Sequence, residues 1–165
     1  MIVFGAAFLF NLMQKNGLID KINSSVAGLH HTSEVRFFLL ALGLTGFFEG
    51  VAGFGTPGAI VPLLLISLGY NAVLSVSVVL LFNGLFAIFG AVGTPLTIGI
   101  QIPLQLSEGL MFEIGIISAL ISLLVVFLWL FYVFRMFAAY GIRLYHKKLI
   151  IGLYTLFAIP FCLFA

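Results

Sequence analysis

The feature that most constrains this chain is a long region without charge. Residues 50–107 contain no Asp, Glu, Lys, Arg or His, and Glu49 stands directly before them. Hydrophobic residues make up 63% of the chain, charged residues make up 7%, and the mean hydropathy is +1.31. Soluble globular domains carry roughly 25% charged residues. The composition therefore excludes a soluble domain and predicts an all-α polytopic membrane protein, because helices of about 20 apolar residues cross a bilayer.

Charge and cysteine usage exclude other classes. The net charge is only +2, and the basic residues cluster in two loops, so the chain has no basic face for nucleic acid. Cys162 is the single cysteine, which excludes a disulfide within the chain. The sequence opens at Met1 inside an apolar run without the pattern of a signal peptide. We therefore expect an incomplete protein.

A glycine-rich stretch at residues 46–58 interrupts the apolar sequence and contains Glu49 and Pro57. A carboxylate at the bilayer centre costs about 2.5–3.5 kcal/mol, and each glycine or proline inside a helix costs about 1 or 3 kcal/mol. Broken backbone persists in a membrane only where it is buried in protein or lines a watery cavity. This stretch therefore predicts a polar functional site.

The chain divides into segments by hydropathy and charge. We expect one transmembrane region, residues 1–165, with a re-entrant hairpin at 37–68, a discontinuous helix at 71–103, a span at 109–134, and partial spans at 1–13 and 149–165. Loops 14–36 and 135–148 hold all the Lys and Arg residues, which places both loops in the cytoplasm. An even number of crossings must separate them, and 37–68 is too short to cross twice. A hairpin with a glycine-rich tip satisfies both conditions.

Two short motifs resemble each other. Residues 53–57 (Gly-Phe-Gly-Thr-Pro) and 91–95 (Ala-Val-Gly-Thr-Pro) share Gly-Thr-Pro. Each predicts a helix start, with Thr as the N-cap and Pro at the first helical position. Two helix starts near mid-membrane would present free N–H groups and positive dipole ends to an anion, as the discontinuous helices of transporters do. A chance match of three common residues is the alternative.

Glu49 is the strongest candidate site residue. A carboxyl that loses its hydration is more readily protonated near neutral pH, so Glu49 could carry a proton or pair with a cation. The alternative is a structural acid that accepts hydrogen bonds from the broken backbone. Thr56 and Thr94 could donate hydroxyls to a ligand or only cap helices, and Asn83 could contact the ligand or bond another helix.

Other polar residues favour structural roles. Glu108 and Glu113 fall in the first turns of a helix that begins near Ser107, where acids interact well with the dipole. The His30-His31 pair could bind metal, but adjacent histidines lack the spacing of helical metal ligands. No nucleophile and base occur together, so we do not expect an enzyme, and we expect no metal or cofactor.

At these motifs the sequence resembles the lactate permease family of bacterial transporters. The resemblance rests on residues 48–57 (Phe-Glu-Gly-Val-Ala-Gly-Phe-Gly-Thr-Pro), 68–70 (Leu-Gly-Tyr), Asn83 and 89–95 (Phe-Gly-Ala-Val-Gly-Thr-Pro), in this order and spacing. One departure follows Asn83. The family commonly has Thr and then Pro there, whereas this chain has Gly84, Leu85 and Phe86.

The resemblance implies proton-linked uptake of L-lactate, and of glycolate as a related substrate, through the inner membrane. With the chemistry of the residues above, we expect proton coupling at Glu49 and a substrate site that comprises Gly53, Gly55, Thr56, Asn83, Gly93 and Thr94. The expected partners are the substrate with its proton, membrane lipid and a missing second half of the transporter, and a homodimer is left open. The alternatives are a channel, with the hairpin as a pore loop, and a non-functional remnant of a split transporter gene.

Overall fold

The structure is a computed structural model that describes residues 2–28, 32–53 and 55–163. The His30-His31 pair lies outside the described residues. Every element in the described part is helical. The elements are α1 (Ile2–Lys15), α2 (Leu18–Ala27), α3 (Ser33–Ala52), α4 (Thr56–Ser67), α5 (Ala72–Phe86), η1 (Ala87–Phe89), α6 (Gly90–Leu96), η2 (Thr97–Gln101), α7 (Ile102–Leu104), α8 (Glu108–Ala139) and α9 (Lys147–Leu163).

Three helical runs are long and apolar enough to cross a membrane. They are Ser33–Ala52, Ala72–Leu104 and Glu108–Ala139. At 1.5 Å per residue, the 32-residue α8 is about 48 Å long, which exceeds the bilayer's hydrocarbon thickness of about 30 Å. Apolar side chains along α8 are widely exposed, among them Leu120, Leu124 and Phe127. The chain is therefore an all-α membrane protein with several membrane-crossing segments.

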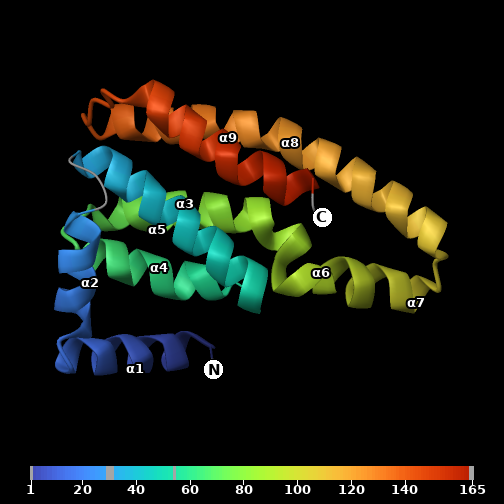
Figure 1. Ribbon diagram of the computed structural model, residues 1–165, viewed down its shortest axis with the longest axis horizontal. Coiled ribbons are helices and arrows are strands. Elements are labelled where there is room, and N and C mark those ends of the chain that lie inside the picture. The colour runs from blue at the N-terminus through green and yellow to red at the C-terminus, as the bar shows by residue number, and fades with distance from the viewer. Residues whose placement is uncertain (1, 29–31, 54, 164–165) are drawn as a thin grey trace.

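Helices α3 and α4 form a helical hairpin around Gly53 and Gly55. They run side by side in opposite directions, and α4 is the shorter arm (Figure 1). The Tyr70 hydroxyl, which follows α4, donates a hydrogen bond of 3.0 Å to the carbonyl of Ser33 at the start of α3. Both ends of the hairpin consequently lie at the same end of the bundle.

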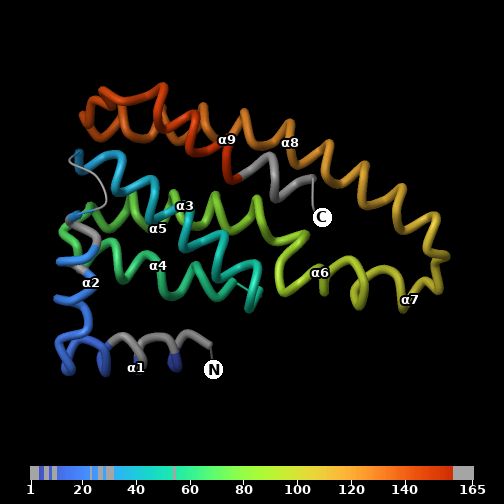
Figure 2. Tube along the Cα trace, in the orientation of Figure 1, coloured from blue at the N-terminus to red at the C-terminus, as the bar shows by residue number. Residues whose placement is uncertain are grey.

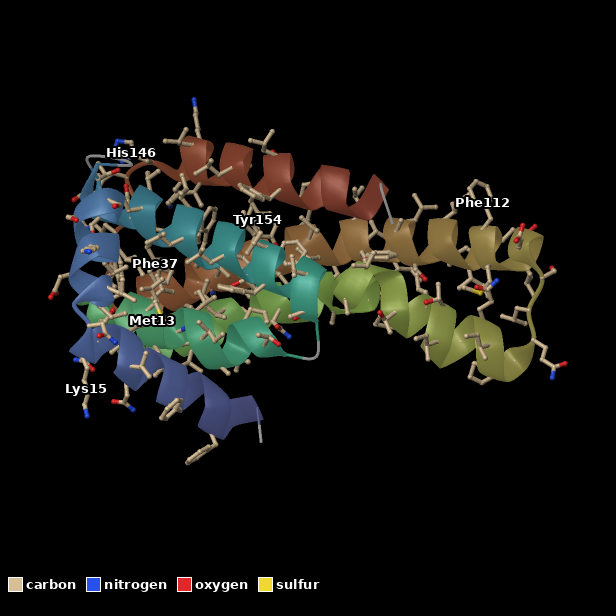
Figure 3. The ribbon with its side chains drawn as sticks, turned by 60° about the horizontal axis from the view of Figure 1, so that its bottom comes forward. Met13, Lys15, Phe37, Phe112, His146 and Tyr154 are labelled. Carbon is tan, nitrogen blue, oxygen red and sulfur yellow. The ribbon has the colours of Figure 1, made fainter. Side chains whose placement is uncertain are left out.

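The loop between α8 and α9 is fastened to this same end by Glu34. The Glu34 carboxylate accepts hydrogen bonds from the backbone N–H groups of Tyr145 (3.0 Å) and His146 (2.9 Å), and its Oε1 lies 2.6 Å from His146 Nδ1. Figure 3 shows Lys15 and His146 towards one end of the molecule and Phe112 of α8 towards the other. The connections rich in Lys and Arg thus share one end, which we call the basic-loop end.

The core lies among α3, α4, α5, α8 and α9. Phe38, Val61 and Phe82 are almost fully buried there, and the Tyr154 ring of α9 lies 5.4 Å from that of Phe82. The break after α5 divides the 72–104 run, and the chain steps sideways there before it continues into α6 and α7 (Figure 2). The hairpin packs against this break, because α3 contacts both α5 and α6.

Two expected boundaries differ from the structure. The first arm of the hairpin begins at Ser33 rather than at 37, because Glu34 and Arg36 join the first turns of α3. The span expected to end at 134 continues to Ala139, with Arg135 inside the helix and its guanidinium carbon 5.9 Å from the Phe131 ring centroid. Polarity marks where the apolar layer ends, whereas backbone hydrogen bonding decides where the helix ends.

Candidate functional site

The hairpin tip touches the broken helix at corresponding positions of the two repeated motifs. A Cβ atom added to Gly53 would lie 2.7 Å from Ala91 Cβ and 2.9 Å from Ala91 N. Gly53 opens the first motif and Ala91 opens the second. Only a residue without a side chain allows this approach, so the glycine permits the contact between hairpin and break.

The two motifs also share their local geometry. Gly55 has φ 76° and ψ 12°, and Gly93 has the same values. The Thr56 hydroxyl donates to the Gly53 carbonyl at 2.8 Å, and the Thr94 hydroxyl donates to the Ala91 carbonyl in the same way. The Gly-Thr-Pro repeat in the sequence therefore corresponds to a repeated local structure.

The expected caps are corrected by one residue. The N-cap of α4 is Gly55 in the left-handed region, followed by Thr56 at the first helical position and Pro57 at the second. Gly55 has no side chain to cap the helix, and the Thr56 hydroxyl instead donates a hydrogen bond to the Gly53 carbonyl. In both motifs the threonine closes the turn before the helix start.

The break itself is strained. Ala91 and Val92 have φ values of 46° and 57°, which L-residues with a Cβ rarely adopt. Each such residue costs on the order of 1–3 kcal/mol, and strain of this kind gathers at functional sites. The Val92 side chain is 89% exposed. The strained turn is thus presented on the surface of this chain, directly beside the hairpin tip.

Glu49 lies one helical turn before Gly53 and is 2% exposed. A Cβ atom on Gly90 would lie 2.7 Å from Glu49 Oε1, so Gly90 provides the room for the carboxylate. The Gly55 N–H donates a hydrogen bond to the carboxylate, and Oε2 has no hydrogen-bond partner among the described residues. Gly90 was not among the expected site residues, although it opens the second break just as glycines surround the first.

The expected site residues separate into two groups. Around the contact lie Glu49, Gly53, Gly55, Thr56, Gly93 and Thr94. Asn83 lies two turns before Gly90 on α5, roughly 10 Å away along the axis, with its Oδ1 buried and unpartnered. The contact therefore assembles a carboxyl and two helix starts, and half-buried Asn83 lies about two turns closer to the basic-loop end.

The departure after Asn83 has a structural counterpart. A Cβ atom on Gly84 would lie 3.0 Å from Cη2 of Trp129 on α8. The absence of a side chain at Gly84 thus lets the indole of α8 pack against α5. The difference from the family at Gly84 therefore lies on the surface of α5 that packs against α8. The Glu49 carboxylate lies elsewhere, against Gly90.

Glu108 and Glu113 are exposed at the start of α8, at the opposite end from the basic loops. Ser107 caps this helix, and its side chain accepts a bond of 3.4 Å from the Leu110 N–H. In the described part of the chain, no group of three or more His, Cys, Asp or Glu side chains could hold a metal ion. Because of their position at that end of α8, Glu108 and Glu113 do not belong to the hairpin site.

The chemistry of the site follows from opposite helix directions. From the contact, α4 runs back towards the basic-loop end, and the run from Thr94 to Leu104 continues towards Ser107 (Figure 1). Both runs begin beside the Gly53–Ala91 contact. Unpaired N–H groups at helix starts favour negative charge. The arrangement can bind a small anion next to a buried carboxyl.

Several known proteins are similar in sequence to this chain. A sequence model described as L-lactate permease matches residues 1–165. The L-lactate permease of Bacillus subtilis (strain 168) is 36% identical over 96 residues, which is 58% of this chain and 17% of that protein. The L-lactate permease of Salmonella typhimurium is 32% identical over 101 residues (61% and 18%), and the glycolate permease GlcA of Escherichia coli (strain K12) is 33% identical over 101 residues (61% and 18%).

These matches cover about a fifth of the length of the curated relatives. No solved structure matches the chain. The family match extends over every residue of the chain, including the hairpin tip, the strained break and the buried carboxyl between them. This chain therefore belongs to the L-lactate permease family.

Proposed function

We propose that this chain forms the hairpin-and-break part of the substrate site in a proton-coupled carrier. The substrate is L-lactate or a related 2-hydroxymonocarboxylate such as glycolate. The observation that carries the proposal is the contact of Gly53 with Ala91, which brings two helix starts together beside Glu49. The names of the relatives, L-lactate permease and glycolate permease, support this substrate class.

The substrate carboxylate would bind at the helix starts that follow Gly55 and Gly93. Backbone N–H groups would be its main donors, because the hydroxyl protons of Thr56 and Thr94 already bond backbone carbonyls. Asn83, about two turns before Gly90, would approach the substrate from the basic-loop side of that carboxylate. Discontinuous helices hold substrate carboxylates in this manner in other transporters.

Glu49 would carry the accompanying proton. Its Oε2 is buried without a partner among the described residues, so a bare negative charge there is unfavourable. A substrate anion bound nearby would repel that charge further and favour the protonated carboxyl. One anion and one proton would then cross together, with little net charge moved.

The proposal is tested by lactate uptake into cells that produce the intact transporter. We expect saturable uptake that rises as the external pH falls and that glycolate inhibits. A carrier saturates because each turnover needs a conformational change. A flux that increases linearly with lactate concentration and does not depend on pH would contradict a carrier and favour a channel.

Replacing Thr56 or Thr94 by Val should weaken lactate binding several-fold, because the hydroxyl's bond to a backbone carbonyl contributes about 0.5–1.5 kcal/mol to holding the turn before each helix start. Valine keeps the shape but loses the bond that closes the turn before each helix start. Apparent affinity for lactate is the measurement, with Thr→Ser at each position as the matched control. Unchanged affinity in the Val variants, at equal protein levels, would limit both threonines to a structural role.

The membrane topology is tested by cysteine labelling in a background without Cys162. Single cysteines at Asn16, Ala72 and Tyr140 should react only from the cytoplasmic side, and one at Gly109 only from outside. All four positions are exposed in the structure. External labelling at Ala72 would make the hairpin a full crossing and contradict the re-entrant arrangement.

A further inference from the structure

Four buried side-chain oxygens have no hydrogen-bond partner among the described residues: Thr45 Oγ1, Glu49 Oε2, Ser75 Oγ and Asn83 Oδ1. Ser75 lies in the first turn of α5, and the other three lie further along α3 and α5. Thr45 is 0% exposed and Glu49 is 2% exposed. Buried polar atoms in proteins are almost always paired, with protein groups or with ordered water. Their grouping near the proposed proton carrier therefore needs an explanation.

Thr45 behaves differently from other threonines of this chain. The hydroxyls of Thr56, Thr94, Thr97 and Thr155 each donate to a backbone carbonyl three or four residues earlier. That bond is the usual solution for a threonine in a helix. The Thr45 hydroxyl makes no such bond, although the helix offers the carbonyl of Ala41. Its hydroxyl is free to bond a group outside α3.

Thr45 and Glu49 lie on one face of α3, one turn apart. Residues at this spacing have Cβ atoms about 5–6 Å apart. A water molecule between the Thr45 hydroxyl and the Glu49 carboxylate would make hydrogen bonds of about 2.8 Å to both. Asn83 precedes Phe86 by one turn on α5, and the Phe86 ring packs against Gly46 of α3.

Thr45 and Asn83 lie on the basic-loop side of the level of Glu49 and Gly90. Both α3 and α5 start at that end, and Thr45 precedes Glu49 just as Asn83 precedes Gly90. Apolar residues such as Leu42 and Phe82 fill the core around them. A polar strip in an apolar core is suited to water and to proton movement along hydrogen bonds.

Few other groups could titrate in this region. Helices α4, α5 and α6 contain no Asp, Glu, Lys, Arg, His or Tyr. The charged residues and tyrosines on the other helices packed nearby are Lys15 on α1, Glu34 and Arg36 at the start of α3, Glu108, Glu113, Tyr132 and Arg135 on α8, and Lys147, Lys148 and Tyr154 on α9. Of these, Tyr154 reaches the core, with its ring against Phe82. Glu49 is thus the only carboxyl of the described residues at the depth of the site.

We propose that Thr45, with Asn83, holds ordered water that passes the proton between Glu49 and the basic-loop end. The inference rests on the proposed proton role of Glu49. The path takes one proton from solvent at that end and delivers one to Glu49 Oε2, which becomes a carboxylic acid. Release reverses both transfers, so no other reactant is needed. Thr45 is a positioning residue in this path.

The test compares Thr45→Val with Thr45→Ser in the intact transporter. Valine has nearly the same shape without the hydroxyl, and serine keeps the hydroxyl. Thr155→Val is the matched control, because that hydroxyl bonds only its own helix at Gly152. Two quantities are measured across a pH series: lactate accumulation driven by a proton gradient, and lactate exchange at equal pH on both sides.

We expect Thr45→Val to lower proton-driven accumulation about tenfold and to leave exchange intact, while the Ser and Thr155 variants match the wild type. A Val variant with the wild-type pH profile would overturn the inference. Equal losses in Val and Ser, in accumulation and exchange alike, would reduce Thr45 to a packing residue and also overturn it. Failure of the proposed function would differ, because the wild type itself would then show no proton-driven accumulation.

Discussion

Glu49→Gln should abolish pH-driven accumulation of lactate and spare its exchange. Glutamine keeps the size of the side chain, and its amide oxygen can still accept the bond from the Gly55 N–H. The amide cannot take up or release a proton between the two sides of the membrane. The accumulation ratio should therefore fall to about one at every pH gradient, because a carrier without coupling only equilibrates its substrate.

The measurement is labelled lactate in vesicles with an imposed pH gradient, followed by counterflow at equal pH. Glu113→Gln is a suitable control, since this acid is exposed on α8 near the opposite end of the bundle. If the Glu49→Gln variant accumulates lactate against its gradient with normal pH dependence, Glu49 is structural. A loss of exchange as well would instead indicate that the carboxyl is needed to form the substrate site.

Gly53→Ala should both destabilise the protein and stop transport. The new Cβ would lie 2.7 Å from Ala91 Cβ and 2.9 Å from Ala91 N, at a residue with φ 60° and ψ −156° that glycine alone adopts easily. The backbone conformation costs on the order of 1–3 kcal/mol, and overpacking costs typically about 1–3 kcal/mol more. The hairpin tip would move away from the break and separate the two helix starts.

The measurement is thermal unfolding in detergent together with lactate uptake. Gly69→Ala separates strain from contact, because Gly69 has φ 87° with no atom within 4 Å of the added Cβ. It should lower stability by the strain alone, on the order of 1–3 kcal/mol, and preserve transport. Equal effects of both variants would show that the Gly53–Ala91 contact contributes nothing beyond backbone conformation.

Much of the fold could be predicted because its signals are local. The lack of charge in residues 50–107 already requires a membrane, and the distribution of Lys and Arg puts two loops on one side. The Gly-Thr-Pro repeat indicated two helix starts, because glycine and proline restrict the backbone regardless of neighbours. Even so, the sequence pattern places the N-cap of α4 one residue too late, at Thr56, whereas Gly55 is the N-cap and takes the left-handed conformation.

Gly90 and Thr45 show where prediction from the sequence stopped. Nothing in the chain's periodicity says that Gly90 provides the space for Glu49, because the two residues lie in different helices. Thr45 looks like any threonine on an apolar helix, and only the missing bond to its own backbone distinguishes it. Similarly, the sequence shows Gly84 only as a departure from the family pattern, whereas the structure places the indole of Trp129 against it.

The sequence by itself determined the membrane setting, the broken helices and the presence of one carboxyl among glycines, because composition and backbone preference act residue by residue. Tertiary structure alone decided that Gly53 meets Ala91, that Gly90 faces Glu49, and that α3 begins at Ser33. These outcomes depend on how helices distant in the chain pack together. The packing of two helices depends on the shapes of both helices, and the sequence of one segment describes only one of the two.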